Sequence, residues 1–259
     1  MRVLWVLAHP DGRSLNGSLR DDGVRTLRQH GHEVVESDLY SMGWDPVVRA
    51  EDFADDSAER LDVLTASQHA YEEQRLSPDI RAEHDKIRWA DTLVLQFPLW
   101  WFGPPAILKG WFDRLFVQGF AQGVRDPRTG RTLRYGNGGL AGRRAMVVTT
   151  VGAQAASTGP RGIHGDIGEV LFPLQHGTLW YTGMTVLPPV VVNGAVCLSE
   201  GGYAEAVDEL RRRLLTMPST PPIPFRRQDG GEYDERLVLC PEHVPGDAGV
   251  GVHYRSDGH

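Results

Sequence analysis

Cysteine is almost absent from this chain, and long apolar runs are absent altogether. Only Cys197 and Cys240 occur, and neither lies in a spacing typical of metal ligands. This count excludes a disulfide framework and predicts no metal site. No segment approaches the about 20 apolar residues that a membrane-spanning helix needs, so we expect no membrane insertion. Residues 1–10 lack the basic region and the cleavage site of a signal peptide, which predicts a cytoplasmic protein.

Lysine is also rare, and charge of neither sign is gathered into blocks. Lys86 and Lys109 are the only lysines, so arginine supplies nearly all of the 27 basic residues, a bias typical of a GC-rich bacterial genome. The 34 acidic residues leave a formal net charge of −7. Scattered charge of this sign argues against a nucleic-acid partner and against an anionic membrane surface. At 259 residues the chain is long enough for one sizeable α/β domain with an appendage.

Strand-like and helix-like segments alternate along most of the chain. Five segments are typical of strands: residues 2–8, 32–39, 92–98, 143–151 and 185–192. The helix-like segments are residues 15–30, 51–75, 79–90, 105–117, 166–182 and 200–216. This alternation predicts an α/β fold with a doubly wound parallel sheet of five strands in the order 2-1-3-4-5. Pro188 and Pro189 favour an edge position for the fifth strand.

Two segments stand outside this alternation. Residues 119–142 form a Gly- and Arg-rich insertion in which turn signals flank the sequence TLRY, so we expect a small β-excursion or a flexible lid. After Met217 the composition shifts to proline and glycine with no helical period. Residues 218–259 therefore cannot bury a core of their own, and we expect an irregular, extended arm that is partly disordered or ordered only by packing across a dimer. Residues 1–217 are the predicted domain.

The most informative segment is residues 96–116, QFPLWWFGPPAILKGWFDRLF. A buried strand ends at Pro98, a loop with three aromatic residues follows, and Pro104 and Pro105 open a helix, because a first-turn residue needs no amide donor. Doubly wound sheets bind cofactors at the carboxyl ends of their strands, so this loop suits a flat, π-rich ligand. The alternative is a loop folded over its own core, which is the commoner place for aromatic residues. The proline and glycine residues that bracket the loop favour the ligand.

The loop from His9 to Asn16 lies between the first strand and the first helix. Unpaired amides and the helix dipole make such a position an anion site, where Ser14 and Asn16 can donate to phosphate oxygens. The local sequence explains Ser14 equally well as a helix cap. Neither a GxGxxG nor a P-loop pattern occurs, which argues against a dinucleotide-binding Rossmann site.

Five segments in the same order carry a resemblance to a known family: residues 6–16 (VLAHPDGRSLN), 33–47 (EVVESDLYSMGWDPV), 76–80 (LSPDI), 96–116 and 162–166 (GIHGD). Over roughly residues 1–215 the chain resembles the FAD-dependent NAD(P)H:quinone reductases of the flavodoxin-like superfamily, the DT-diaphorase type. The resemblance implies a flavodoxin-like fold and a homodimer.

The resemblance also implies roles for individual residues. The FAD pyrophosphate would lie on the first loop, at His9, Ser14, Leu15 and Asn16. The flavin ring would be lined by residues of two further loops: Pro98, Leu99, Trp101, Phe102, Thr149, Thr150, Val151 and Gly152. Leu15 replaces the family's phenylalanine, and Val151 stands where the family has glycine.

His164 of GIHGD is the catalytic group that the resemblance implies. An imidazole can stabilise the negative charge that hydride transfer leaves on a flavin, or relay a proton. A lone histidine is more often a surface or satisfied residue, but the full GIHGD match favours function. The family pairs this histidine with a tyrosine, and Thr158 takes that position with a hydroxyl far less acidic than a phenol. The implied substrate pocket comprises Trp101, Phe102, Gly152 and His164.

These features together predict a flavin-dependent two-electron reductase. Hydride would pass from NAD(P)H via FAD to a quinone or a similar flat aromatic acceptor, in a ping-pong cycle over one pocket. The family's contacts to adenine are replaced near Asp62 and Tyr203, which leaves FMN as an alternative cofactor. Two other functions stay open: a flavin-binding regulatory subunit of a bacterial potassium-efflux transporter, and a dedicated tailoring reductase in aromatic natural-product biosynthesis.

Overall fold

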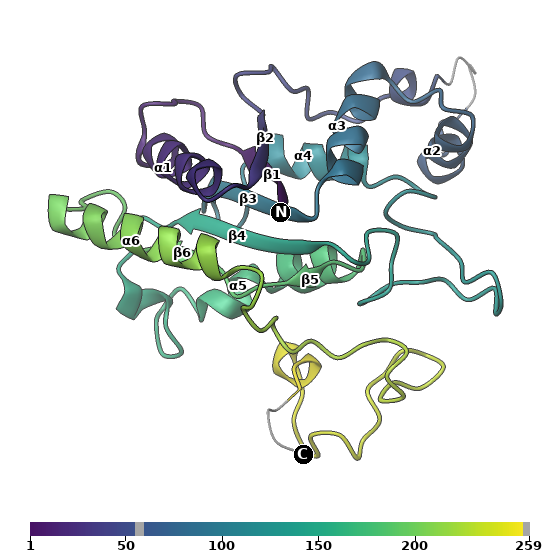
Figure 1. Ribbon diagram of the computed structural model, residues 1–259. Helices are drawn as coiled ribbons and strands as arrows, with labels where there is room; N and C mark the ends of the chain where they lie inside the picture. The colour runs from purple at the N-terminus through teal and green to yellow at the C-terminus, as the bar shows by residue number, and fades with distance from the viewer. Residues whose placement is uncertain (55–59, 256–259) are drawn as a thin grey trace.

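A parallel β-sheet forms the centre of the computed structural model, which describes residues 1–54 and 60–255 (Figure 1). The strands lie in the order β2-β1-β3-β4-β5, and β6 also pairs with β4. Their bounds are Arg2–Leu7 (β1), Glu33–Asp38 (β2), Thr92–Pro98 (β3), Arg144–Thr150 (β4), Thr185–Val186 (β5) and Val190–Val192 (β6). The predicted α/β fold and strand order are confirmed.

Helices connect the strands as the alternation predicts. The α-helices are Leu15–Gln29 (α1), Val63–Glu72 (α2), Pro78–Trp89 (α3), Ala106–Leu115 (α4), Ile167–Leu174 (α5) and Glu200–Thr216 (α6). Shorter helices are Ala50–Phe53 (η1), Ala155–Thr158 (η2), the π-helix Gln175–Trp180 (η3) and Val250–His253 (η4). The helix-prone segment 51–75 contains two separate helices, η1 and α2, and residues 55–59 between them lie outside the described residues.

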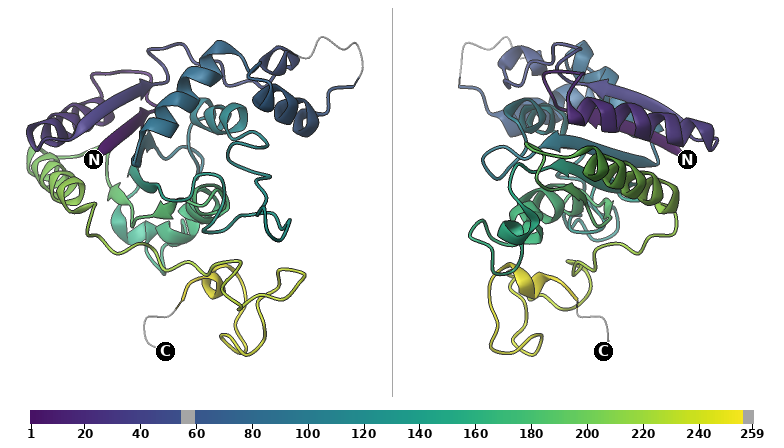
Figure 2. Two further views of the ribbon diagram at one scale, coloured as in Figure 1. Left: turned by 45° about the vertical axis from the view of Figure 1, so that its right-hand side comes forward. Right: turned by 90° about the vertical axis from the view of Figure 1, so that its left-hand side faces the viewer.

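Both faces of the sheet are buried. Along β1, Leu4 and Val6 pack into the core beneath α3, α4 and α5, whereas Val3 and Trp5 pack into the core beneath α1 and α6 (Figures 1 and 2). This alternation follows from the period of two in a strand. Because helices cover both faces, the ends of the strands are where a ligand can reach the sheet.

The fifth strand differs in one respect from its prediction. The segment 185–192 forms two short strands rather than one, because Pro188 and Pro189 have no amide hydrogen for the ladder. Both β5 and β6 pair only with β4, so the segment does lie at an edge of the sheet.

The insertion 119–142 lies at the amino ends of the strands, since it connects the end of α4 to the start of β4 (Figure 1). Its tip is a minimal hairpin, in which the amide of Leu133 donates to the carbonyl of Val124 at 2.8 Å. Further along, the amide of Tyr135 donates to the carbonyl of Tyr181, just before β5. The expected β-excursion is therefore present in a short form. These contacts hold the insertion at the amino ends of the strands, on the edge opposite to the carboxyl ends.

The C-terminal arm, residues 218–255 of which are described, packs on the α5 side of the molecule (Figures 1 and 2). It contains only η4 and isolated bridges, as an irregular arm should. However, Phe225 is 4% exposed and belongs to the main core, and the indole of Trp180 donates to the carbonyl of Arg226 at 3.1 Å. The expectation that the arm is ordered only across a dimer is therefore wrong. Residues 256–259 of the predicted arm lie outside the described residues.

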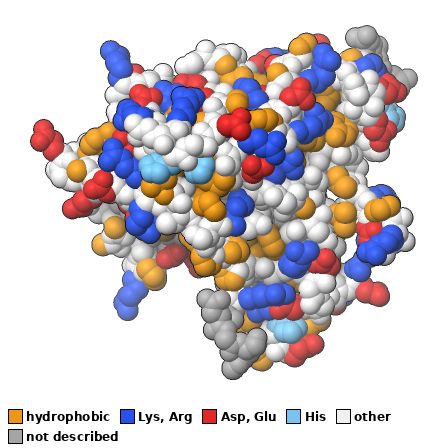
Figure 3. Space-filling model, in the orientation of Figure 1, with side chains coloured by type: hydrophobic (Ala, Val, Ile, Leu, Met, Phe, Trp, Pro, Cys, Tyr) orange, Lys and Arg blue, Asp and Glu red, His pale blue; other side chains and the backbone are white. Residues whose placement is uncertain are grey.

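The surface carries mixed charge on the face that Figure 3 shows, where acidic and basic side chains are interspersed. Opposite charges also pair directly within helices, as Lys109 does with Asp113 one turn away in α4. Among the described residues, no helix combines the length and the apolar character needed to cross a membrane.

Candidate active site

The start of α1 provides the first part of the candidate site. Ser14 caps the helix, and its Oγ accepts a hydrogen bond from the amide of Gly17 at 3.1 Å. None of the described residues accepts a hydrogen bond from the amides of Leu15 and Asn16. Two free donors and the positive end of the helix dipole therefore lie at the carboxyl end of β1, where an anion is stabilised.

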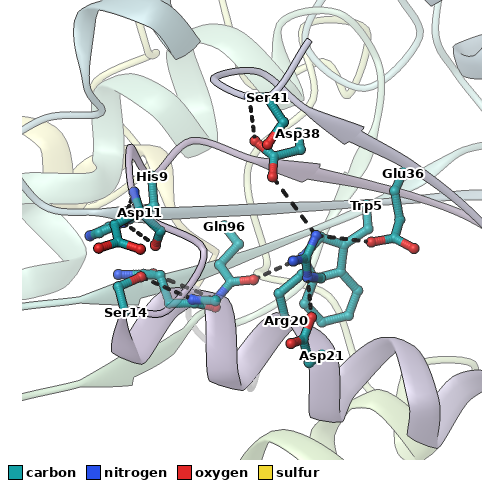
Figure 4. A network of polar contacts seen from close by, with 12 residues as sticks. Trp5, His9, Asp11, Ser14, Arg20, Asp21, Glu36, Asp38, Ser41 and Gln96 are labelled. Carbon is teal, nitrogen blue, oxygen red and sulfur yellow. Dashed lines mark hydrogen bonds and ion pairs between the residues drawn. The ribbon is translucent and has the colours of Figure 1, made fainter.

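The loop before α1 is compact and polar (Figure 4). The amide of Asp11 donates to Nδ1 of His9 at 3.1 Å, and the Arg13 guanidinium pairs with the Asp11 carboxylate. Hydrogen bonds from Arg13 hold the pKa of the Asp11 carboxyl below its usual range. A Cβ at Gly17 would meet the carbonyl oxygen of Gly12, so the loop lies directly over the first turn of the helix.

A chain of buried hydrogen bonds fixes this turn to the sheet (Figure 4). The indole of Trp5 donates to Oε1 of Gln96 at 2.8 Å, and Nε2 of Gln96 donates to the carbonyl of Asn16 at 2.7 Å. Nδ2 of Asn16 then donates to Oγ1 of Thr150 at 2.9 Å. The sequence analysis missed this chain, although Gln96 is a lone polar residue inside an apolar strand, and a buried polar group needs a partner.

The aromatic loop after β3 is a tight turn. The amides and carbonyls of Trp100 and Gly103 bond to each other in both directions at 3.0 Å. The two residues between them, Trp101 and Phe102, have φ values of 49° and 60° and are 97% and 55% exposed. A left-handed conformation at a bulky residue costs on the order of 1–3 kcal/mol, and such strain is concentrated at ligand sites. The loop is therefore not folded over its own core.

The end of β4 lies beside this turn. The amide of Leu99 donates to the carbonyl of Thr150 at 2.9 Å, and Pro98 is buried in the pairing of β3 with β4. Oγ1 of Thr149 donates to the carbonyl of Phe97, so this side chain stabilises the pairing of β4 with β3. Val151 is buried, and its amide donates to the carbonyl of Val192 at 2.8 Å.

Gly152 is exposed just beyond the strand. A Cβ at this position would come within 3.1 Å of the Val196 side chain, so the glycine keeps the edge of the sheet open. None of the described residues accepts a hydrogen bond from the amides of Trp101, Phe102 or Gly152. Three donors on neighbouring loops are thus available to the polar rim of a flat ligand.

His164 lies next to the aromatic turn, and its ring centroid is 5.9 Å from that of Phe102. It is exposed, and its amide donates to the carbonyl of Ser157 at 3.0 Å. Thr158 is 5% exposed, and its hydroxyl lies 3.1 Å from Oδ1 of Asn193. Thr158 therefore holds its loop against the end of β6, and its hydroxyl is directed toward Asn193.

The predicted site residues come together along one edge of the sheet. Asn16 contacts Thr150, Leu99 contacts the same strand end, and Phe102 faces His164. This convergence follows from the strand order, which makes β1, β3 and β4 neighbours. The arrangement offers an anion site, exposed aromatic faces and an imidazole in one row.

Known proteins share this sequence and fold. A family model described as the flavodoxin-like fold matches residues 1–215. A ribosyldihydronicotinamide dehydrogenase-like protein of Penicillium crustosum is 44% identical over 99% of this chain and 97% of its own length. The rat NAD(P)H dehydrogenase [quinone] 1 is 37% identical over 86% of this chain and 80% of its own length.

A solved structure is similar over nearly the whole chain. It is that of a Klebsiella pneumoniae protein whose assignment as a quinone reductase is provisional, and it is 45% identical, with a TM-score of 0.94, over 98% of this chain and 100% of its own. Fold and sequence together place this chain in the flavodoxin-like family. Within that family it is an oxidoreductase of the group that contains the NAD(P)H dehydrogenases (quinone).

Proposed function

We propose that this protein is a flavin-dependent reductase that takes hydride from NAD(P)H and passes it to a quinone or a similar flat aromatic acceptor, with FAD as the cofactor. The observation that carries the proposal is the strained turn at Trp101 and Phe102, which exposes two aromatic rings beside unpaired amides. The names of the relatives support the same activity.

The residues present fit a flavin nucleotide. The amides of Leu15 and Asn16, at the start of α1, would bind the phosphates. Trp101 and Phe102 would pack against the ring system, and the amide of Gly152 would donate to its polar rim. The bound flavin supplies the acceptance and the release of hydride. His9, which accepts the amide of Asp11, and Thr150, which accepts from Nδ2 of Asn16, would add polar groups near the phosphates and the ring.

His164 would provide the polar catalytic group. Its exposed imidazole, next to Phe102, can donate a proton or stabilise negative charge at the edge of a ring stacked on that turn. Thr158 would act as a positioning residue, because its hydroxyl holds the turn whose Ser157 carbonyl accepts the amide of His164. The reductase would thus work without the phenol that the family places near this histidine.

NAD(P)H and the quinone would bind in turn at the same exposed edge of the sheet, which makes the reaction a ping-pong cycle. Trp101, Phe102, Gly152 and His164 would line the shared pocket. A homodimer and a cytoplasmic location stay predictions; light scattering of the purified protein measures the first, and cell fractionation the second.

Purification and rapid kinetics test the proposal. We expect a yellow protein whose released cofactor is FAD, and parallel lines in double-reciprocal plots with NADPH and a small quinone. A colourless protein that takes up neither FAD nor FMN would overturn the flavoprotein assignment. A protein that binds flavin, reduces none of the quinones tested and co-purifies with a transporter would favour the regulatory-subunit alternative.

His164→Ala tests the catalytic role separately. Stopped-flow reduction by NADPH should slow by roughly 10–1000-fold, the effect of losing a proton donor or a charge-stabilising group. His9→Ala is the matched control, because it removes an imidazole from the phosphate end and should change flavin retention more than the reduction rate. Reduction of the His164→Ala protein at the wild-type rate would rule out this mechanism and leave the flavin site intact.

A further inference from the structure

The loop that carries His164 holds one positive charge to which the proposed mechanism gives no role. Arg161 is exposed and lies three residues before His164. It is the only lysine or arginine between Arg144 and Arg211, so it is the only such cation on the loops that follow β4 and β6. None of the described residues forms an ion pair or a side-chain hydrogen bond with its guanidinium. This charge is therefore available to a ligand.

Backbone hydrogen bonds hold this loop in one shape. The amide of Gly162 donates to the carbonyl three residues earlier at 2.8 Å, which closes a turn with Pro160 and Arg161 at its centre. Proline favours the first central position of such a turn, because its φ is already fixed. A Cβ at Gly162 would meet the backbone of Ser157, so the turn packs directly on the residue whose carbonyl accepts the amide of His164. The backbone thus fixes the positions of the guanidinium-bearing residue and the imidazole-bearing residue relative to each other.

The proposed reaction brings two pyrophosphate groups to one edge of the sheet, one in FAD and one in NAD(P)H. The amides at the start of α1 would bind the first. Arg13, the arginine of that loop, already pairs with the Asp11 carboxylate. The aromatic turn after β3 contains no lysine or arginine. Arg161 is therefore the cation that the loops of the site offer to the second pyrophosphate.

The position of Arg161 also favours the hydride donor over the cofactor. The site extends from Asn16 through Thr150 and the aromatic turn to His164, so Arg161 lies at the end away from the start of α1. When a dihydronicotinamide ring stacks on the flavin, its ribose and phosphates extend beyond the rim of the ring. A guanidinium offers parallel N–H donors that match phosphate oxygens. The formal net charge of −7 repels an anionic donor, and a local positive charge offsets this repulsion.

We propose that Arg161 binds the pyrophosphate of the hydride donor, so that the enzyme favours NAD(P)H over a dihydronicotinamide compound without phosphate. This inference rests on the proposed reductase function and assigns a class of donor to it. The guanidinium contacts the phosphates while His164 lies at the reacting ring, so a single loop holds the two ends of the dihydronicotinamide half of the donor. Because NADH and NADPH share the pyrophosphate, Arg161 acts on both equally.

Stopped-flow reduction of the flavin in Arg161→Gln tests the contact. We expect the donor concentration that gives half of the maximal rate to rise roughly 5- to 50-fold for NADH and for NADPH, the effect of losing one charged hydrogen-bonding partner. The maximal rate should stay the same, because the residue binds the donor away from the reacting ring. Dihydronicotinamide riboside, which carries no phosphate, should reduce the variant and the wild type with the same kinetics.

A donor analogue that cannot transfer hydride measures the same contact without turnover. The Kd of 1,4,5,6-tetrahydro-NAD, followed by the flavin spectrum, should rise by a similar factor in Arg161→Gln. Arg161→Lys keeps the charge and should recover most of the affinity. Added salt should weaken binding to the wild type more than binding to Arg161→Gln, because salt screens the charge that the variant lacks. Arg212→Gln, which removes an exposed cation of α6, is the matched control and should behave as the wild type.

The two nucleotides and the riboside separate the possible results. Unchanged half-saturation by NADH in Arg161→Gln would overturn the inference. An equal rise with the riboside would also overturn it, because the residue would then act on the ring or on the fold. A rise with NADPH alone would assign the contact to the 2′-phosphate and overturn the pyrophosphate assignment. Wild-type flavin that the riboside reduces and NADH does not would overturn the inference and keep the reductase, whereas flavin that no donor reduces would overturn the proposed function itself.

Discussion

The aromatic turn after β3 and the C-terminal arm both lack regular secondary structure, but different forces hold them in place. The turn is fixed by its own backbone, through the paired hydrogen bonds of Trp100 and Gly103, and its side chains are exposed. The arm has few backbone pairings, and burial of Phe225 and Arg226 holds it. A loop that is held by backbone hydrogen bonds keeps its side chains free to contact a ligand. A segment that is held by buried side chains does not, because those side chains already pack against the core.

The largest effect should come from the arm. Phe225→Ala removes a ring that is 4% exposed and belongs to the main core, so we expect the free energy of unfolding to fall by about 3–5 kcal/mol. Denaturant titration measures this loss. The folded fraction should retain flavin, since the site lies at the other end of the strands. A loss below about 1 kcal/mol would mean that the arm is not held by burial.

The contact between α3 and the insertion should also be sensitive to acid. His84, buried against Phe120 of the insertion, has a pKa lowered to about 4, chiefly by burial. Its folded pKa lies below the unfolded value, so its stabilisation is complete above about pH 6.5 and is lost as the pH falls toward 4. Between pH 7.5 and pH 5 this residue alone should cost about 2 kcal/mol.

Denaturant titrations at both pH values check this dependence. His84→Gln cannot take up a proton and retains a donor for the carbonyl of Leu115, which accepts from Nε2 of the wild-type ring at 2.7 Å. The variant should lose less stability on acidification than the wild type does. Identical losses in the two proteins would assign the acid sensitivity to other groups.

Phe225→Ala should lower stability and leave flavin binding intact, whereas Trp101→Ala should weaken flavin binding and leave stability intact. The side chain is 97% exposed, so its removal should change the free energy of unfolding by less than about 0.5 kcal/mol. Flavin affinity should fall by about 1–3 kcal/mol, the loss of one stacking face. Equilibrium dialysis of the apoprotein with FAD measures the second effect. If flavin affinity stayed the same, Trp101 would not be a flavin contact.

The smallest effect should appear in Trp101→Gly. Glycine adopts a positive φ without strain, so the apoprotein should gain about 0.5–1 kcal/mol of unfolding free energy over Trp101→Ala. Thermal denaturation of the two variants side by side resolves this difference. A less stable glycine variant would show that the turn is not strained.

The sequence predicts the sheet well because its signals are local. Apolar runs and caps identified five strand segments and their order, and GIHGD and the aromatic loop indicated the residues at the carboxyl edge. Residues 185–192 split into two strands because Pro188 and Pro189 have no amide hydrogens to donate to β4. The π-helix that begins at Gln175 depends on tertiary packing. Neither has a periodic signal.

The arm and the polar chain behind the site could not be predicted for a related reason. Phe225 is buried through contacts with α5 and η3, about 50 residues away, which composition alone does not encode. The bond between Asn16 and Thr150 joins the first turn of α1 to the end of β4, 134 residues apart along the chain. Such pairings follow from the fold and cannot be read from a segment.

The buried indole of Trp5 has a consequence for which atoms of the candidate site carry hydrogen. An indole nitrogen only donates, so Gln96 must present its oxygen to Trp5 and its amide nitrogen to the carbonyl of Asn16. The same Gln96 nitrogen also donates to Oδ1 of Asn16 at 3.5 Å, which turns the side-chain nitrogen of Asn16 toward Thr150. That nitrogen fills an acceptor position on Thr150 Oγ1, and the hydroxyl hydrogen of Thr150 then points elsewhere. A tryptophan in the middle of the sheet thus sets the direction of a whole row of dipoles, and the last of them leaves a threonine proton available at the rim of the sheet.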